Sequence, residues 1–209
     1  MRLRNIKGAK EAVLKSPYVI EDPHMYCGNW STLFANQNPI HLEIGMGKGR
    51  FLIENAIRYP NINFIGIEKY YSVLIKAIDR LEILDLPNLK IIPMDAKKME
   101  QVFDHEIDTI YLNFSDPWPK NKHEKRRLTS QEFLRRYDTL FEFKKHIIVK
   151  TDNRKLFEYS VISCTDYGYQ IKKISCNLYE DEIEDNIPTE YEMKFSSKGY
   201  PIYRLEIEK

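Results

Sequence analysis

The sequence predicts an α/β fold in which a mostly parallel sheet carries helices on both faces. Short apolar runs typical of buried strands alternate five times with segments of helical spacing. Strands of this kind are apolar throughout, so both faces of their sheet need a cover of helices. Two further strand-like runs close the chain, and they predict an antiparallel edge.

The first elements follow directly from the apolar pattern. Residues 39–47 form an apolar run that ends in glycines, which indicates a buried strand. Residues 49–60 have helical spacing and stop at Pro60. Residues 63–69 are predicted to form a second strand. A helix is predicted over residues 70–86 because one stripe of it is apolar. The stripe consists of Val73, Leu74, Ala77, Leu81 and Leu84.

The remaining elements complete the alternation. In chain order they are strands 89–96 and 108–114, a helix 129–143, a strand 146–153, a helix 153–166 and strands 169–179 and 203–209. Thr129, with Glu132 three places on, is the expected N-cap of the helix 129–143. In open sheets of this type ligands bind at the carboxyl ends of the strands. The candidate site residues are therefore those that follow each strand.

The length of 209 residues predicts one domain with an appendage. Residues 1–30 form the appendage, a basic arm interrupted by Pro17 and Pro23. The arm is expected to contain a short helix and either to lie on the domain or to be mobile. Residues 31–209 form the domain. The acidic run 180–185 is expected to be a solvated loop, and no role is assigned to it.

Composition limits the classes of protein to consider. The net charge is +1, so only a local basic cluster could bind nucleic acid. Three scattered cysteines without a C-x-x-C spacing indicate neither a disulfide framework nor a metal site. The sequence contains no apolar run long enough for a signal peptide or a membrane span. A cytoplasmic protein without a membrane or metal partner is expected.

A glycine turn joins the first strand to the first helix. Gly45, Gly47 and Gly49 permit positive φ and the close approach of a ligand. The dinucleotide fingerprint is G-x-G-x-x-G, and Arg50 occupies the place of its last glycine, which argues against NAD. Taken alone, this pattern is as typical of a structural turn as of a cofactor site.

Acidic residues stand at the ends of the next two strands. Glu68 ends the second strand, at a distance from Gly45 close to the roughly 20 residues expected for an acid that binds ribose hydroxyls. Asp95 ends the third strand, where it could accept a hydrogen bond from an adenine amino group. Each acid alone is better explained as a solvated strand end. Together they favour a cofactor that contains a nucleoside.

Glu43 lies inside the first strand, where an unpaired carboxylate is costly. An ammonium group of a ligand and an internal hydrogen-bond donor explain it equally well. An acid-lined pocket suits a cationic ligand better than a pyrophosphate. S-adenosylmethionine carries both a sulfonium and an ammonium group, so the sequence favours it over NAD.

The stretch 113–128, NFSDPWPKNKHEKRRL, combines an acid, a Trp between two prolines and a run of bases. The prolines restrict the backbone around Asp116, which could accept hydrogen bonds from the N1–H and N2–H₂ edge of guanine. Trp118 is expected either to stack on a base or to serve as a core or lid aromatic. The basic tract 120–127 is either a solvated charge run or, beside a site, a phosphate-binding surface.

These motifs occur together in one known family. The segments LEIGMGKGRFL, IGIEK, MDA, NFSDPWPKNKHEKRRL, VKTDN, TEYE and KGYPIYR follow one another in this order. From near residue 25 to its end, the chain resembles the bacterial tRNA (guanine-N7)-methyltransferases. The resemblance implies a Rossmann-like class I methyltransferase fold with a seven-stranded sheet. It also implies methyl transfer from S-adenosylmethionine to N7 of the variable-loop guanine of tRNA.

The resemblance further implies roles for individual residues. Asp116 takes the catalytic role and also contacts the cofactor. The remaining implied cofactor-binding residues are two glycines of the turn and three acids: Gly45, Gly47, Glu43, Glu68 and Asp95. The implied substrate-binding residues are Lys120, Asp152, Thr189, Glu190, Tyr191 and Glu192. The implied RNA contacts are Lys122, His123, Glu124, Lys125, Arg126 and Arg127.

The expected chemistry needs no base to activate the nucleophile, because N7 of guanine carries a lone pair and no proton. Asp116 is therefore expected to position the base and to stabilise the cationic product. Two other interpretations stay open: an RNA-binding protein without activity, and a methyltransferase that acts on a small molecule or a protein. The chain is expected to act as a monomer or a homodimer.

Overall fold

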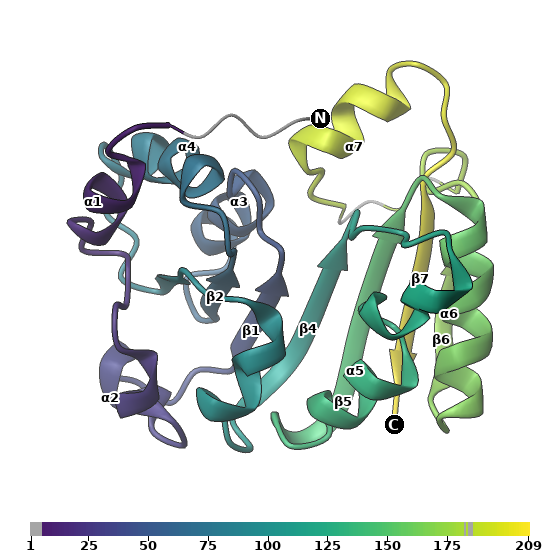
Figure 1. Ribbon diagram of the computed structural model, residues 1–209, viewed down its shortest axis with the longest axis horizontal. Helices are drawn as coiled ribbons and strands as arrows, with labels where there is room; N and C mark the ends of the chain where they lie inside the picture. The colour runs from purple at the N-terminus through teal and green to yellow at the C-terminus, as the bar shows by residue number, and fades with distance from the viewer. Residues whose placement is uncertain (1–5, 182, 184–185) are drawn as a thin grey trace.

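A computed structural model shows a seven-stranded sheet with helices packed against it (Figure 1). It describes residues 6–181, 183 and 186–209, so Arg2 and Arg4 of the basic arm and part of the acidic run 180–185 lie outside the described residues. The strand order is β3-β2-β1-β4-β5-β7-β6. Strands β1 to β5 are parallel, and β7 runs antiparallel to both of its neighbours. The predicted parallel sheet with an antiparallel edge is confirmed.

The strands match the apolar runs of the sequence. They are β1 (Ile40–Ile44), β2 (Asn63–Ile67), β3 (Leu89–Ile92), β4 (Ile107–Asn113), β5 (Phe141–Thr151), β6 (Gln170–Ser175) and β7 (Tyr203–Glu208). Strand β1 is paired on both sides, with Leu42 opposite Ile65 in β2 and opposite Ile110 in β4. All three side chains are fully buried.

The helices connect the strands and cover them. The α-helices are α1 (Ala9–Leu14), α2 (Trp30–Phe34), α3 (Arg50–Arg58), α4 (Tyr71–Leu81), α5 (Gln131–Tyr137), α6 (Arg154–Asp166) and α7 (Glu190–Ser196). Three short 3₁₀ helices are η1 (Pro23–Tyr26), η2 (Ala96–Gln101) and η3 (Asn121–Arg126).

Two apolar clusters show which helices cover which face of the sheet. One cluster joins α2, η2, α5 and α6 through buried residues such as Trp30 and Tyr137. The other joins α1, α3 and α4 through residues such as Leu52 and Leu74. Each such side chain contributes about 1.5–3 kcal/mol when it is buried completely. Helices therefore cover both faces, as the apolar strands require.

The described part of the arm packs on the domain. Val13 of α1 is fully buried in the cluster that contains α4. Val19 forms a parallel bridge with Ile91 of β3, so the arm continues the edge of the sheet. The Tyr18 hydroxyl donates to the carbonyl of Leu84 and accepts from the N–H of Leu86 at 3.1 Å. Of the two expected arrangements, residues 6–30 have the one that lies on the domain.

The helix predicted over residues 129–143 is shorter than expected. Its N-cap is Ser130, whose Oγ accepts from the N–H of Phe133 at 3.4 Å. The Oγ1 of Thr129 instead lies 2.8 Å from the Oγ of Ser160. The helix ends at Tyr137, and β5 already begins at Phe141. The predicted N-cap was wrong, because the hydroxyl of the buried Thr129 has a partner on α6. The predicted helix end was also wrong, since residues 141–143 belong to β5.

Helix α7 was not predicted, although its start has a sequence signal. Thr189 and Glu192 form a capping box: the Oγ1 of Thr189 accepts from the N–H of Glu192 at 3.0 Å, and a carboxylate oxygen of Glu192 accepts from the N–H of Thr189 at 3.3 Å. The helix lies beyond the end of β4, on the side of α4 (Figure 1). It therefore borders the edge of the sheet where ligands are expected.

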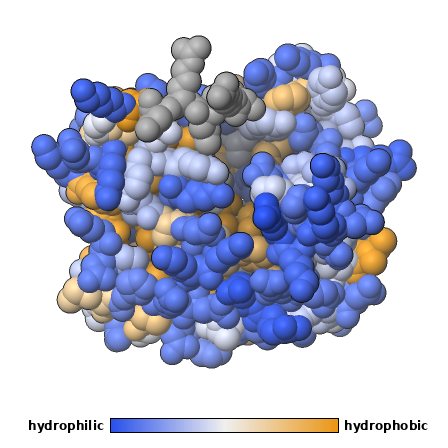
Figure 2. Space-filling view, in the orientation of Figure 1, coloured by the Kyte–Doolittle hydropathy of each residue, from blue (hydrophilic) through white to orange (hydrophobic). Residues whose placement is uncertain are grey.

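The surface is predominantly polar. Figure 2 shows mainly hydrophilic residues on one face, with small apolar patches between them. This agrees with the mean hydropathy of −0.51. In the described ranges no helix has the length and apolar character needed to cross a membrane.

Candidate functional site

A cavity of about 430 Å³ lies at the carboxyl ends of β1, β2, β3 and β4. This is the size range of small-molecule sites, and the position is the one that parallel sheets use for ligands. Its walls combine apolar side chains, such as Ile67 and Phe133, with three acids. The acids are Glu68, Asp95 and Asp116, all of them predicted site residues.

The glycine turn forms one side of the cavity. Gly45, Gly47 and Gly49 have φ values of 80°, 59° and 78°, which side chains rarely adopt. A Cβ added to Gly45 would meet no atom within 4 Å, so this glycine leaves open space beside the cavity wall. A Cβ on Gly49 would lie 3.0 Å from the Cβ of Ala77 in α4. Gly49 therefore allows the turn to pack closely on α4, and Gly45 leaves room for a ligand in the cavity to approach the backbone.

Close packing between α3 and the sheet depends on a glycine that sequence reasoning missed. A Cβ on Gly66 in β2 would lie 2.3 Å from the Sδ of Met46 and 2.7 Å from a methyl carbon of Leu52. In the dinucleotide fingerprint the last glycine, on the helix, allows helix and strand to pack closely. Here Gly66 on β2 plays that part, and the helix position is Arg50. Arg50 does not crowd the contact, because its Nε forms an ion pair with Glu54 at 2.7 Å.

The acids at the strand ends differ in what they contact. One carboxylate oxygen of Glu68 accepts from the N–H groups of Lys69 and Tyr70 at 2.8 and 3.0 Å. Burial raises the pKa of Glu68, and these hydrogen bonds oppose the shift. Asp95 caps η2 by accepting from the N–H of Lys97 at 3.0 Å. Asp116 is exposed and lines the cavity.

Lys69 interacts with Tyr70 and with two acids of the cavity. Its ammonium group lies 4.8 Å from the ring centre of Tyr70, and Lys69 lines the same cavity as the acids. Partial burial opposes the shift, but the Tyr70 hydroxyl and the carboxylates of Asp95 and Asp116 raise the pKa of Lys69. Lys97 and Arg126 line the cavity as well, so its charges are mixed, and its three acids offer acceptors to ligand groups that carry positive charge or hydrogen-bond donors.

Glu43 lies behind the cavity wall. Its side chain is 1% exposed, and one oxygen accepts from the Nδ2 of Asn113 at 2.8 Å. The other oxygen of Glu43 and the Oδ1 of Asn113 are buried without a hydrogen-bond partner. Burial raises the pKa of Glu43 to about 8, against the opposing effects of Asn113 and Lys150. The Oδ1 of Asn113 is an unpaired acceptor, and the second oxygen of Glu43 becomes one when the acid ionises, so the two suit a cationic donor such as an ammonium group.

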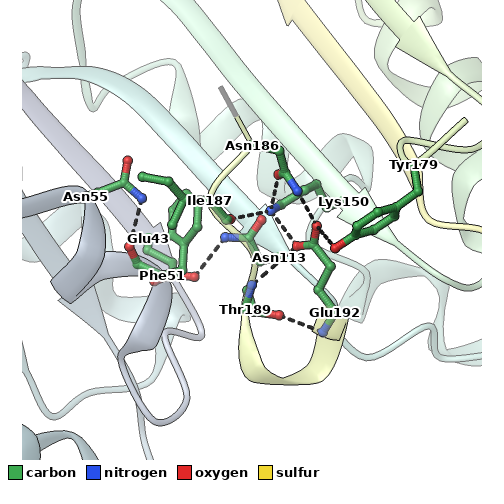
Figure 3. A network of polar contacts seen from close by, with 10 residues as sticks. All are labelled: Glu43, Phe51, Asn55, Asn113, Lys150, Tyr179, Asn186, Ile187, Thr189 and Glu192. Carbon is green, nitrogen blue, oxygen red and sulfur yellow. Dashed lines mark hydrogen bonds and ion pairs between the residues drawn. The ribbon is translucent and has the colours of Figure 1, made fainter. Parts of the chain in front are cut away.

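A buried ion pair lies beside Glu43 and Asn113 (Figure 3). The ammonium group of Lys150, at the end of β5, donates to Glu192 at 2.6 Å, to the Oδ1 of Asn186 at 3.1 Å and to the carbonyl of Ile187 at 3.0 Å. The side chains of Lys150 and Glu192 are 3% and 0% exposed. All three ammonium protons therefore have acceptors, which a buried charge requires.

The carboxylate of Glu192 is also fully engaged. Besides Lys150, it accepts from the Nδ2 of Asn186 at 2.6 Å and from the hydroxyl of Tyr179 at 3.3 Å. Figure 3 shows these groups gathered around it. The predicted substrate contact of Glu192 is thus an anchor for α7 in this structure. Sequence reasoning placed Asn113 and Lys150 at strand ends but assigned neither a role, because their buried partners come from segments far away in the sequence.

The other predicted substrate residues of α7 face the sheet edge and α4. Glu190 forms an ion pair with Arg80 of α4. The hydroxyl of Tyr191 donates to Asp152 at 3.2 Å, just after β5. The ring of Tyr191 lies 5.0 Å from that of Phe114, which lines the cavity. These contacts link α7 with both halves of the sheet edge.

The predicted RNA tract forms η3 at the rim of the cavity. Lys120, Lys122 and Lys125 are exposed. Arg126 lines the cavity, and its guanidinium lies 4.9 Å from the ring centre of Trp118. The other predicted tract residues contact the protein. The His123 ring packs edge-on against Trp118 at 5.7 Å, Glu124 accepts from the Tyr159 hydroxyl at 3.0 Å, and Arg127 bonds to backbone carbonyls.

The structure thus brings most predicted residues to one edge of the sheet. Gly45, Glu68, Asp95, Asp116 and Arg126 line the cavity itself. Glu43 and Gly47 lie beside it, and Lys120 and Asp152 lie near its rim on the segments after β4 and β5. Within the described ranges, no group of three or more His, Cys, Asp and Glu residues could hold a metal ion.

The fold and the position of the cavity define a Rossmann-like α/β protein with a candidate ligand site at the carboxyl edge of its sheet. Comparison with solved structures shows the same fold in methyltransferases. An antibiotic-related methyltransferase has a TM-score of 0.66 and 16% identity, covering 87% of this chain and 92% of the other. A 16S rRNA (adenine(1408)-N(1))-methyltransferase from Catenulisporales acidiphilia, crystallised with the cosubstrate SAM, has a TM-score of 0.62, with 12% identity over 90% of this chain and 91% of the other.

Sequence comparison is more specific. A model of the family described as putative methyltransferase matches residues 37–205. The tRNA (guanine-N(7)-)-methyltransferase of Lachnoclostridium phytofermentans is 50% identical over 98% of this chain and 97% of its own length. The protein of the same name in Streptococcus suis is 49% identical over 99% of this chain and 98% of its own length. The chain belongs to the bacterial tRNA (guanine-N7)-methyltransferase family, which confirms the resemblance.

Glu43 should make stability depend on pH. Its pKa is about 8 in the folded protein and near 4.5 in the unfolded chain. Between these values the folded state holds the proton, so the free energy of unfolding should fall as pH rises, by at most about 1.4 kcal/mol per pH unit. Urea unfolding of Glu43→Gln should show a shallower dependence than wild type. Glu158→Gln, an exposed control, should match wild type, and equal slopes for Glu43→Gln and wild type would refute the assignment.

Breaking the buried ion pair should be costly. Lys150→Met leaves the carboxylate of Glu192 buried without its cation and should lower the free energy of unfolding by about 3–5 kcal/mol. Adding Glu192→Gln should recover part of the loss, because no uncompensated charge remains. Urea unfolding of the double-mutant cycle measures this coupling. The exposed pair Arg154–Glu158, at 2.8 Å, serves as control and should show a coupling below about 1 kcal/mol. A similarly small coupling for the buried pair would contradict the prediction.

Proposed function

We propose that this chain transfers the methyl group of S-adenosylmethionine to N7 of the variable-loop guanine of tRNA. One observation carries the proposal: the acid-lined cavity meets the basic segment η3 at Arg126, so a cofactor pocket and a phosphate-binding surface share a rim. Family membership adds the reaction, because the relatives at about half identity over the full chain are named for it.

The residues present fit S-adenosylmethionine. Glu68 and Asp95 offer carboxylate oxygens for ribose hydroxyls and for the adenine amino group. The unpaired oxygens of Glu43 and Asn113 offer acceptors for an ammonium group. The open space at Gly45 lets the backbone approach the ligand closely. When bound, S-adenosylmethionine supplies the electrophilic methyl group.

Asp116 is proposed as the residue that holds the guanine. Its exposed carboxylate at the cavity wall can accept from the N1–H and N2–H₂ groups of the base. N7 has no proton to lose, so the contribution of Asp116 is orientation and stabilisation of the positive charge that develops on the ring. Lys120, Asp152 and the segment 189–191 are proposed to contact the substrate at the rim, with Glu192 anchoring α7 behind them.

The tRNA backbone is proposed to lie along η3. Lys122 and Lys125 are exposed, and Arg126 adds a cation next to Trp118, whose ring could stack on a base. Guanine N7 in folded tRNA takes part in tertiary contacts, so extruding the base costs a few kcal/mol, and phosphate contacts offset that cost.

A direct assay tests the function. The protein is incubated with labelled S-adenosylmethionine and unmodified tRNA, and the digested RNA is analysed for 7-methylguanosine. A tRNA in which the variable-loop guanine is replaced by adenine should stay unlabelled. Label in protein or in a small molecule without RNA would favour the alternative methyltransferase. Tight tRNA binding without any transfer would favour a non-catalytic RNA-binding protein.

Asp116→Asn should separate positioning from base catalysis. The amide sets a donor against the donors of guanine, so turnover should fall about a hundredfold. Asp166→Asn, at the exposed end of α6, should keep wild-type turnover. The wild-type rate of the chemical step should be flat between about pH 6 and 8, since no proton leaves the nucleophile. A steep rise over this range that Asp116→Asn abolishes would indicate a general base and overturn the role.

The salt dependence of tRNA binding tests the phosphate contacts. The double variant Lys122→Gln/Lys125→Gln should flatten the slope of log K against log salt by about 1.4–1.8, because each phosphate contact contributes about 0.7–0.9. Lys172→Gln/Lys173→Gln on β6, at the far edge of the sheet, should leave the slope at its wild-type value. A wild-type slope in the η3 variant would mean that the two lysines are only solvated.

A further inference from the structure

The backbone that carries Asp116 is strained on both sides of the residue. Phe114 and Trp118 have φ values of +51° and +41°, in the left-handed region that bulky side chains avoid. Conformations of this kind cost about 1–3 kcal/mol each and persist only where the surroundings fix them. Contacts at both ends must therefore fix the turn formed by residues 114–118.

The first end of the turn is fixed by the sheet. The N–H of Phe114 donates to the carbonyl of Lys150 at 2.8 Å, which continues the pairing of β4 with β5. The ring of Phe114 packs on Tyr191 of α7 at 5.0 Å. The second end, at Pro117 and Trp118, lies beyond the sheet and has no such pairing.

Arg127 fixes the second end. Its Nε donates to the carbonyls of Pro117 and Trp118 at 3.2 and 3.3 Å, and its Nη2 donates to the carbonyl of Trp118 at 3.2 Å. The guanidinium lies 4.2 Å from the ring centre of Tyr159 on α6. The Tyr159 hydroxyl in turn donates to Glu124 at 3.0 Å. The Nε and Nη2 groups and one face of this half-buried guanidinium are thus engaged within the protein.

Its neighbours in the tract differ from Arg127. Lys122 and Lys125 are exposed, with their ammonium groups available to a polyanion. Arg126 is also exposed and lies over the Trp118 ring without bonding to the turn. A planar guanidinium can bond to two successive carbonyls while it packs on an aromatic ring, which the ammonium group of a lysine does not reproduce. A phosphate contact through the Nε or Nη2 of Arg127 would have to compete with these bonds.

We propose that Arg127 is a positioning residue for the methyl transfer: it holds the turn 114–118, and through it the carboxylate of Asp116, in the geometry that the reaction needs. The role of Asp116 in this statement rests on the proposed function. Arg127 acts through its hydrogen bonds to the turn, whereas Lys122, Lys125 and Arg126 act through their charge. Replacing Arg127 by lysine keeps the positive charge and removes the planar set of donors, so this substitution separates the two roles.

Steady-state kinetics and tRNA binding of three variants test the proposal. Arg127→Lys should lower kcat about ten- to a hundredfold, because small misplacements of reacting groups have effects of that size. Arg127→Gln should do the same, with the wild-type slope of log K against log salt. Arg126→Gln should flatten that slope by about 0.7–0.9. Arg135→Gln, an exposed charge on α5, should match wild type in kcat and in slope.

A readout without tRNA keeps the test independent of the function. The chain has two tryptophans, and Trp30 is fully buried on α2. With 5-fluorotryptophan incorporated, the ¹⁹F signal of Trp118 should be single in wild type and broadened or split in Arg127→Lys, while the signal of Trp30 stays unchanged. Tyr159→Leu keeps residue 127 as arginine but removes the ring on which its guanidinium packs. This variant should broaden the Trp118 signal as well.

The outcomes separate cleanly. A wild-type kcat in Arg127→Lys, or a flattened salt slope in Arg127→Gln, would make Arg127 a phosphate contact and overturn the proposal. A single, unshifted Trp118 signal in both Arg127→Lys and Tyr159→Leu would do so too. If the wild-type protein does not methylate tRNA, the proposed function fails, and the ¹⁹F signals still decide whether Arg127 holds the turn.

Discussion

The ion pair between Lys150 and Glu192 is the interaction on which the candidate site most depends. It joins the end of β5 to the start of α7, two segments far apart in the sequence, in a place where both charges are buried. Such a pair contributes little net stability over an apolar contact, but it tolerates few alternative arrangements. α7 is therefore held at the sheet edge by geometry that a hydrophobic contact would not specify. The ring of Tyr191 can then reach Phe114, and Glu190 can reach Arg80.

Most of the fold could be predicted from the sequence because its signals are local. Apolar runs bounded by glycine, proline or acid identified every strand, and the pair of strand-like runs that closes the chain predicted the antiparallel edge. The misses arise where tertiary contacts decide. Thr129 has the pattern of an N-cap, yet its hydroxyl bonds to Ser160, and Ser130 caps the helix instead. Helix α7 has a true capping box, but it is too short for an apolar period to reveal it.

Part of the site could also be predicted from the sequence. Topology alone gathers the residues that follow parallel strands, so Glu68, Asp95 and Asp116 could be grouped from the amino-acid sequence. The contacts that hold these groups in place could not be predicted. Asn113 and Lys150 lie in apolar strands, and Gly66 looks like any strand glycine until the side chains of Met46 and Leu52 are placed against it. A basic tract likewise does not reveal which of its side chains is turned inward, as Arg127 is.

The chemistry of the family gives these fixed contacts their importance. A nucleophile without a proton leaves little for acid or base catalysis to contribute, so rate enhancement has to come from alignment and from a matching field. The structure is organised accordingly. Asp95 and Asp116 place negative charge in the cavity and interact with the ammonium group of Lys69 at its edge. Glycines with positive φ on one side, and a strained turn tied to β5 and to Arg127 on the other, set the distances. The strain at Phe114 and Trp118 lies on either side of Asp116. We therefore expect the turn to limit the movement of the carboxylate that is proposed to hold the base, whereas the exposed lysines of η3, proposed to contact the RNA, have no such constraint.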